Sequence, residues 1–421
     1  MLEPSATKLG SRRDRSALAV RGFFPLLFAG MCWHWARWGI AFLSAYWVND
    51  ITDSPRMVQL TGTTMWAPLL LGGAIGGVVS DRFDRLRTVQ FQLALLVPVV
   101  ALVGVLELKN SLQLWVIYPF LLVAGVGWVG DMTSRRALVF ELVGAQRLDN
   151  AMAYESFALA TGVAVGNLIG GSVAQSFGVG EGFLVVAGLL IVGLLALNGV
   201  PRTGGTPSEQ HRSRPSTVEE LRAGLSLFRT NKGLRSILGV TVIANFFLFA
   251  YFPAVQRIGD RVGASPSQVG LIAAMTGFGM MVGSLIIGVW EPKRRGLAYV
   301  GGVAFGMAML IPFAASGSVS TAALALFLAT MGSGFFAATQ STLVLTTVDI
   351  NMRGRAMGLL SMAIGALPVG TFLLGEIAER VGASGAVVFM ASTGLVALAL
   401  WLLTHREVLT MGRSGDVSAP Q

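Results

Sequence analysis

The chain has 421 residues, of which 53% are hydrophobic and only 13% are charged, and its formal net charge is +9. Soluble domains carry about 25% charged residues, so this charged fraction is too small to cover a water-soluble globule. The composition predicts a polytopic membrane protein. It excludes a disordered chain, a collagen and a disulfide scaffold, because apolar residues are abundant and Cys32 is the single cysteine.

Twelve apolar stretches are long enough to cross a bilayer as helices, because about 20 residues span its hydrocarbon core. Backbone polar groups must be paired within each crossing segment, and a helix achieves this. The first six spans are expected at residues 23–48, 57–80, 88–107, 112–133, 151–175 and 181–199. The second six are expected at 235–255, 267–290, 297–315, 320–345, 356–377 and 383–404. The sequence therefore predicts an all-α membrane protein.

A polar stretch divides the spans into two sets of six. It is rich in Pro, Gly, Ser and charged residues, and its segment VEELRAGLSLF has the spacing of an amphipathic helix on the membrane surface. The predicted domains are a cytoplasmic tail (1–22), an N-terminal six-helix bundle (23–200), a cytoplasmic linker with this helix (201–234), a C-terminal bundle (235–404) and a cytoplasmic tail (405–421).

The lysines and arginines concentrate in alternate loops. With the N-terminus inside, the inner segments hold 25 of the 31 basic residues and the outer loops hold 5. The positive-inside rule then places both termini in the cytoplasm and the protein in the cytoplasmic (inner) membrane. Because the basic residues are spread over seven segments rather than one patch, we expect no nucleic-acid partner.

The two halves of the chain also repeat each other weakly. Three matching pairs occur in order at offsets of 205 to 211 residues: Ser54-Pro55 with Ser265-Pro266, Gly73–Asp81 with Gly283–Glu291, and Ala151-Met152 with Ala356-Met357. Two pseudo-symmetric six-helix bundles are typical of transporters that rock one bundle against the other around a midplane site.

A charged motif, GVVSDRFDRLR, fills residues 77–87 between the second and third spans. Aspartates interleave with arginines in this short loop, and such a cluster can form charge-assisted bonds to a neighbouring helix end. A simple positive-inside anchor would explain the arginines but not Asp81 and Asp84. The motif therefore favours charge-assisted bonds to a neighbouring helix end over a simple anchor.

This motif resembles the hallmark loop of the major facilitator superfamily, G-x-x-x-D-R-x-G-R-R/K, and D-R-F-D-R is similar to its drug and siderophore exporter branch. The segments FELVGAQRLDNAMAYES and VDINMRGRAMGLLSMAIGALPVGTFLLG are similar to that branch as well. The resemblance implies that the loop is a gate, whose aspartate caps the eleventh helix and whose arginines pair with the fourth. The implied gating residues are Gly77, Asp81, Arg82, Asp84, Arg85, Arg87 and Asp131. The second-half copy, residues 291–295, keeps only an acid and a basic cluster, and we expect it to gate more weakly.

Arg37 lies near the middle of the first span, where an ionisable side chain costs about 2.5–3.5 kcal/mol and so indicates function. Members of the exporter branch often carry an acid there. Beside indoles such as Trp33, a buried guanidinium can bind an aromatic anion by stacking and bidentate hydrogen bonds. The alternative is a structural arginine satisfied by carbonyl groups. We place Trp33 and Arg37 on the substrate pathway.

Two carboxylates lie toward the cytoplasmic side of the first bundle. Burial favours the protonated form of a carboxyl group, so Glu155 is our candidate for proton coupling. For Asp131 we favour a fixed pair with Arg82 or Arg85 over a role in coupling.

Three further polar residues are candidates for the substrate or proton pathway. His34 has the chemistry for proton traffic, and a packing role explains it equally well. Asn245 and Gln340 lie on helices that line the cavity in the resembled family. A hydrogen bond between helices is the alternative for both.

Glycines repeat every four residues in two spans, at Gly162, Gly166 and Gly170 and at Gly279 and Gly283. Such stripes let helix backbones approach closely. In the resembled family these two helices meet between the bundles, so we predict that the stripes form the bundle interface. Packing within one bundle is the alternative.

Signals for cofactor chemistry are weak. The match of Gly125–Gly130 to G-x-G-x-x-G lies inside an apolar span with no strand before it, which favours helix packing over dinucleotide binding. The chain has no Gly-Lys pair for a phosphate-binding loop and no Cys/His spacing typical of a metal site. We expect no cofactor, no metal and no enzymatic activity.

The favoured function is secondary active transport, in the form of proton-coupled export of amphipathic small molecules. Multidrug and siderophore export both fit, with protons as the coupling ion and a monomeric antiporter in the bilayer. The alternative is a lipid or lysolipid flippase of the same fold. A non-transporting sensor would need a soluble output domain, and no loop is longer than the 201–234 linker.

Overall fold

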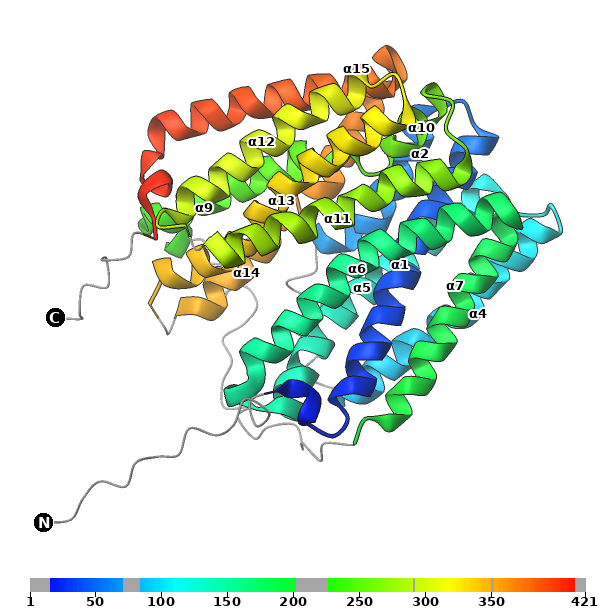
Figure 1. The fold of residues 1–421 in the computed structure, drawn as a ribbon, viewed down its shortest axis with the longest axis horizontal. Coiled ribbons are helices and arrows are strands. Elements are labelled where there is room, and N and C mark those ends of the chain that lie inside the picture. The colour runs from blue at the N-terminus through cyan, green and yellow to red at the C-terminus, as the bar shows by residue number, and fades with distance from the viewer. Residues whose placement is uncertain (1–15, 71–83, 202–225, 291, 350–351, 413–421) are drawn as a thin grey trace, which may run out of the picture.

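The computed structural model describes residues 16–70, 84–201, 226–290, 292–349 and 352–412, except for the side chains of residues 133, 145 and 149 (Figure 1). Within these residues the secondary structure is helical and no strand occurs. The first group of helices comprises α1 (Phe23–Ile51), α2 (Pro55–Trp66), α4 (Arg85–Leu108), α5 (Leu114–Val143), α6 (Leu148–Ser176) and α7 (Val179–Ala196). The second group comprises α9 (Lys232–Ile243), α10 (Ala254–Arg261), α11 (Pro266–Trp290), α12 (Arg295–Ala315), α13 (Val319–Thr347), α14 (Arg353–Ile364) and α15 (Leu367–Thr404).

Side-chain caps mark several helix starts. Ser54 accepts a hydrogen bond from the Met57 amide at the start of α2, where Pro55 occupies the first position. Asn231 accepts one from Leu234 at the start of α9, and Ser318 forms a capping box at the start of α13. These side chains satisfy amide groups that a helix leaves without a partner in its first turn.

Nine helical segments of the described chain are long and apolar enough to cross a membrane. One of them, residues 353–404, has 52 residues and is interrupted at Gly382, where φ is 77°. About 20 residues cross a bilayer, so this segment is long enough for two crossings. α1 is long enough as well, and α2 leads into residues 71–83, which are not described. The described helices are thus compatible with the twelve predicted spans. The linker helix predicted within 201–234 lies mostly outside the described residues. The part that is described, residues 226–230, is helical.

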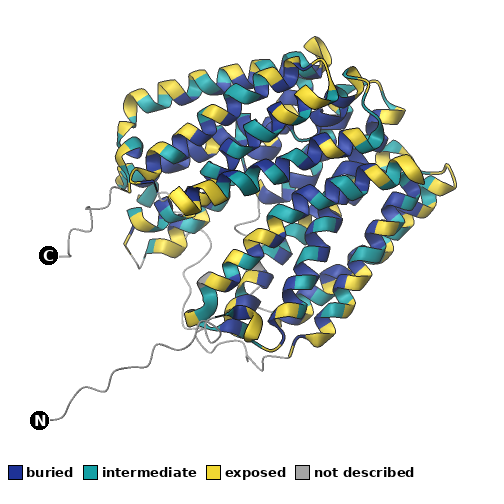
Figure 2. Ribbon diagram, in the orientation of Figure 1, coloured by how far each residue is buried: buried dark blue, intermediate teal, exposed yellow. Residues whose placement is uncertain are grey.

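The two groups contact each other mainly through α6 with α11 and α2 with α15. Within the first group α1 packs on α6 and α7, and within the second α13 packs between α11 and α12. Figure 1 shows the groups side by side at one end and diverging toward the end that carries both chain termini. We call these the distal end and the termini end. Exposed residues alternate with buried ones along the outer helices (Figure 2), and large apolar side chains such as Trp115 and Val289 are among the exposed ones.

The glycine stripe of α6 does not face the second group, so the predicted interface role is wrong. A Cβ atom at Gly162 would lie 2.5 Å from His34, and one at Gly170 would lie 2.8 Å from Phe42. Gly166 faces the same helix, α1. The stripe therefore lets α1 and α6 approach each other within the first group.

The glycines of α11 also face a helix of their own group. Cβ atoms at Gly279 and Gly283 would each lie 2.1 Å from an atom of α13, a helix of their own group. They also do not form the bundle interface. The repeat of small residues identified a close contact correctly, but the partner helix lies within the same group.

Other glycines carry the contact between the groups. The backbones of Gly171 on α6 and Gly270 on α11 face each other, and a Cβ atom at Gly171 would lie 2.8 Å from the Gly270 Cα. A Cβ atom at Gly277 would lie 2.5 Å from the backbone nitrogen of Ala164. Backbone atoms cannot move aside as a side chain can, so these positions require glycine.

Gly277→Leu is therefore expected to destabilise the protein by about 1–3 kcal/mol through overpacking of the α6–α11 contact. Gly288→Leu is the matched control, because it lies in the same helix and has no atom within 4 Å of its would-be Cβ. The melting temperature in detergent should fall for Gly277→Leu only. Equal melting temperatures for the two variants would contradict the assigned contact.

Candidate transport site

The distal end is closed by polar contacts between the two groups. Arg56 Nε lies 2.8 Å from Glu376 Oε1, and Ser54 Oγ donates to Glu379 Oε2 at 2.8 Å. Asn49 Nδ2 donates to Asp260 Oδ2 at 2.5 Å. Among the described residues, the hydrogen bonds and ion pairs that join the two groups all lie in the distal half of the molecule. The contacts are therefore those of a state that is closed distally.

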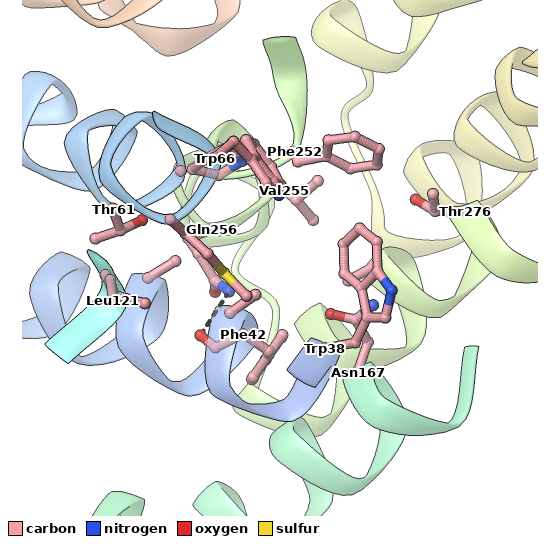
Figure 3. A pocket seen from close by; sticks show the side chains of 16 residues that line it. Trp38, Phe42, Thr61, Trp66, Leu121, Asn167, Phe252, Val255, Gln256 and Thr276 are labelled. Atoms are coloured by element: carbon pink, nitrogen blue, oxygen red, sulfur yellow. Dashed lines mark hydrogen bonds between the residues drawn. The ribbon is translucent and has the colours of Figure 1, made fainter. Parts of the chain in front are cut away.

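An aromatic plug lies just beneath these polar contacts. The ring of Phe252 lies 5.4 Å from that of Trp38 on α1 and 5.3 Å from that of Trp66 on α2. Figure 3 shows these side chains around a cavity of about 40 Å³, with a hydrogen bond from Gln256 to the Phe42 carbonyl. A water molecule needs roughly 10–15 Å³ and a drug-sized ligand needs at least about 300 Å³. The cavity is therefore large enough for a few water molecules and too small for a drug-sized substrate in this state.

The backbone that carries Phe252 departs from a regular helix. α9 passes into a π-helical turn over Ala244–Leu248 and then a 3-10 turn over Phe249–Tyr251, before α10 begins at Ala254. Single π-turns inside helices occur often at functional sites, and irregular backbone at membrane depth is tolerated where protein surrounds it. The break directs Phe252 toward the first group. The sequence predicted one continuous span over 235–255 and missed it.

The closure should respond to removal of the Arg56–Glu376 pair. Both side chains are partly exposed, at 47% and 31%, so the pair is worth about 0.2–1 kcal/mol. Arg56→Gln is expected to raise the opening equilibrium by up to roughly fivefold. The measurement is the maleimide labelling rate of Ala45→Cys, a buried residue of the cavity, with Cys32 replaced by Ala. Arg56→Glu combined with Glu376→Arg should restore slow labelling, and an unchanged rate in Arg56→Gln would contradict the role.

A buried ion pair lies in the first group. Asp131 and Arg135 are one turn apart on α5, and Arg135 Nη2 lies 2.7 Å from Asp131 Oδ1. The Arg135 Nη1 also donates to the Leu26 carbonyl of α1 at 3.1 Å. Of the two predicted partners of Asp131, Arg85 is wrong, because it pairs with Glu141, and Arg82 lies outside the described residues. The physical reason is proximity, since Arg135 lies on the same face of the same helix.

Arg37 lies deeper in the first group and is almost fully buried, with 2% of its surface exposed. Its guanidinium carbon sits 4.1 Å from the ring centroid of Trp128 on α5 and 5.2 Å from that of Trp38. Among the described residues none forms an ion pair with it, and its Nε has no hydrogen-bond partner. A buried cation held on indole faces has capacity to bind an anion.

Glu155 on α6 is a buried acidic residue of the same group, opposite in charge to Arg37. It is buried, and its Oε1 has no hydrogen-bond partner among the residues that the structure describes. Arg135 and Asp131 are the charged side chains that act on it most strongly. Since those two residues neutralise each other, Glu155 is a carboxyl group without a committed partner.

Trp33 and His34 are buried on α1, and Trp33 is fully so. His34 packs against Gly162 in the α1–α6 contact, and neither the Trp33 Nε1 nor the His34 Nδ1 finds a partner in the described chain. His34 thus combines packing with an unused ring nitrogen, and both alternatives from the sequence stay open.

Asn245 and Gln340 gather elsewhere, around Thr241 in the second group. Gln340 Nε2 donates to Thr241 Oγ1 at 3.3 Å, and the Tyr299 hydroxyl lies 2.7 Å from the same oxygen. Asn245 Nδ2 donates to the Thr241 carbonyl at 2.9 Å. The hydrogen bond between helices, which was one of the alternatives, is therefore present for Gln340. Asn245 instead bonds within its own helix.

The gating motif is described only in part. Gly77, Asp81 and Arg82 lie outside the described residues. Asp84 caps α4 by accepting a hydrogen bond from the Arg87 amide at 2.8 Å. The capping explains Asp84 in a loop where the family pattern has glycine.

Sequence reasoning missed three residues that the structure places at the site: Trp128, Arg135 and Phe252. The spacing of Asp131 and Arg135, four residues apart, is a helical ion-pair signal that could have identified the pair. Gly125, three residues before Trp128, packs as expected, because a Cβ there would lie 2.1 Å from the Met65 carbonyl oxygen.

The comparisons with known proteins assign the family. Residues 26–362 and 237–417 match the model of the Major Facilitator Superfamily. The chain therefore belongs to this superfamily, whose members are transporters rather than enzymes.

Relatives with assigned functions are distant but cover most of the chain. It is 20% identical over 354 residues to macrolide efflux protein A of Streptococcus pyogenes, covering 80% of this chain and 84% of that protein. It is 28% identical over 380 residues to the enterobactin exporter EntS of Salmonella typhimurium, covering 85% of each.

Solved structures agree on the fold. A bacterial homolog of the human lysosomal transporter Spinster, in an inward-facing and unoccupied conformation, matches with a TM-score of 0.71 and 15% identity. The match covers 97% of this chain and 100% of that one. A transporter of the POT family in complex with a thioalcohol-conjugated peptide matches with a TM-score of 0.71 and 12% identity, covering 92% and 96%.

Proposed function

We propose that the protein exports amphipathic small molecules by alternating access, driven by proton uptake. The observation that carries this proposal is the pair of uncommitted buried charges, Arg37 and Glu155, in the group of helices next to a closed distal end. The two rocking units are residues 23–200 and 235–404, joined by the 201–234 linker. Efflux is also the function named for the macrolide and enterobactin relatives. Their names give no support to the flippase alternative.

The distribution of basic residues indicates how the protein is oriented in the membrane. Among the described residues, most of the basic ones lie at the termini end, which the positive-inside rule places in the cytoplasm. The protein then sits as a monomer in the inner membrane with both termini inside, and the distally closed state faces the cytoplasm. A substrate would enter from that side, and Glu155 would carry the coupling proton.

The substrate class follows from Arg37. Its guanidinium between Trp38 and Trp128 suits an aromatic anion, a property that some drugs and siderophore-like metabolites share. Arg37→Ala is expected to weaken binding of anionic substrates by roughly 10- to 100-fold, the worth of a charged hydrogen bond, and of neutral ones much less. Tryptophan-fluorescence titration of purified protein measures the affinity for the anionic and for the neutral substrates. Equal losses for anionic and neutral ligands would make Arg37 structural.

The test of the proposed function is transport in proteoliposomes under an imposed pH gradient. The proposal requires that an amphipathic dye moves against its own gradient and that an uncoupler stops this movement. Empty liposomes give the background. Dye movement that an uncoupler leaves unchanged would overturn proton coupling, and a lack of movement with every anionic and neutral dye would overturn the export of amphipathic molecules.

A further inference from the structure

A groove of about 580 Å³ opens at the termini end of the second group, where α11 ends and α12 begins. Its lining changes character along its length. At the termini end it is lined by Trp290 and the cations Lys293 and Arg294, and beyond them by Leu297, Phe305 and Phe335. No carboxylate belongs to the lining among the described residues. The groove is thus cationic at one end and apolar along the rest.

The apolar part follows one stripe of α12. Leu297, Gly301 and Phe305 are four residues apart and therefore lie on the same face of the helix. All three are exposed, and Leu297 exposes half of its surface. The stripe from Arg294 to Phe305 is about 16 Å long at the helical rise. Its floor is α13, which packs between α11 and α12 (Figure 1).

The cationic part lies at the start of α12. Lys293 and Arg294 are exposed, and neither forms an ion pair with any residue in the described chain. The positive end of the α12 dipole adds to their charge. Trp290, 65% exposed, stands beside them, as indoles do at the headgroup level of a bilayer. Charge, amphipathic shape and position therefore match a membrane lipid with an anionic headgroup.

We propose that this groove binds one anionic phospholipid. Its phosphate lies on Lys293 and Arg294, and one acyl chain runs along Leu297, Gly301 and Phe305. In the proposed orientation this lipid comes from the cytoplasmic leaflet, where anionic headgroups attract basic residues next to the membrane. Lys293 and Arg294, which belong to the second-half copy of the gating loop, then bind a ligand of their own.

Retention of lipid by purified protein in native mass spectrometry tests the charged part. The probes are dioleoyl phosphatidylglycerol and dioleoyl phosphatidylcholine, supplied together in equal amounts. We expect the wild type to retain phosphatidylglycerol preferentially and Lys293→Gln/Arg294→Gln to retain roughly tenfold less. Arg229→Gln/Lys232→Gln removes two exposed cations at the same end of the same group and should retain it normally. Equal retention of the two lipids by the wild type, or wild-type retention by the Lys293/Arg294 variant, would overturn the proposal.

Filling the groove tests the apolar part without touching the charges. A Cβ atom at Gly301 meets no atom within 4 Å, so the ring in Gly301→Phe can occupy the groove without a clash. This variant should lose phosphatidylglycerol, whereas Gly188→Phe on α7, where the space is also open, should retain it. Excess inorganic phosphate should leave the lipid bound. Retention by Gly301→Phe, or displacement by free phosphate, would show that the acyl chain does not lie there.

Discussion

Replacing Arg135 by methionine is expected to destabilise the protein by about 3–5 kcal/mol, the largest effect on stability that the structure predicts. Arg135 and Asp131 are 3% and 2% exposed, and removing one charge leaves the other buried without compensation. The substitution also removes the hydrogen bond that ties α5 to the Leu26 carbonyl of α1. The midpoint of thermal unfolding in detergent, followed by size-exclusion chromatography, measures the loss.

A double variant separates charge from packing. Asp131→Leu/Arg135→Met removes both charges and should recover most of the stability, because a buried pair can be replaced by apolar residues of similar volume at little cost. Lys109→Met, which removes an exposed cation at the distal end, should behave like the wild type. An Arg135→Met protein as stable as the wild type would contradict the assignment of the pair as structural.

Replacing Glu155 by glutamine is expected to reduce efflux driven by a pH gradient to the level of empty liposomes. The amide has nearly the same shape, so the fold should be retained, but it cannot take up and release a proton. Exchange of labelled for unlabelled substrate across the membrane needs no net proton movement and should persist. Dye efflux and counterflow in the same proteoliposome preparation measure the two activities.

The control for this variant is Glu181→Gln. Glu181 is a carboxylate in the first turn of α7, outside the buried cluster. The Glu181→Gln variant should export at the wild-type rate. If Glu155→Gln also exports against a gradient and remains sensitive to the uncoupler, another group carries the proton.

Much of the fold could be predicted from the sequence because membrane crossing imposes a minimum apolar length. Helix ends were less predictable. α5 was expected to end near residue 133 and continues to Val143, because its first charges past the apolar run pair within the helix. The span over residues 235–255 was expected to be continuous and is broken at Ala244–Leu248. A paired charge and a π-turn leave the number of apolar residues in the segment unchanged, so that number predicts neither of them.

The candidate site was predictable only in part. Arg37 and Glu155 stood out because charges are rare in apolar spans, and both are buried. The glycine stripes revealed close helix contacts, but residues spaced at i and i+4 do not encode which neighbour they touch. Phe252 had no sequence signal of its own, because its place in the plug depends on the backbone break and on two tryptophans of the other group.

Alternating access requires that the two groups of helices close at one end, distal or termini, when they open at the other. Two pairs of spin labels on exposed residues test it, Asp53 with Arg380 at the distal end and Gln146 with Arg355 at the termini end, with Cys32 replaced by Ala. Pulsed electron paramagnetic resonance in nanodiscs measures both distances as pH and substrate are varied. We expect the first distance to lengthen whenever the second shortens. Distances that stay fixed, or that lengthen together, would contradict it.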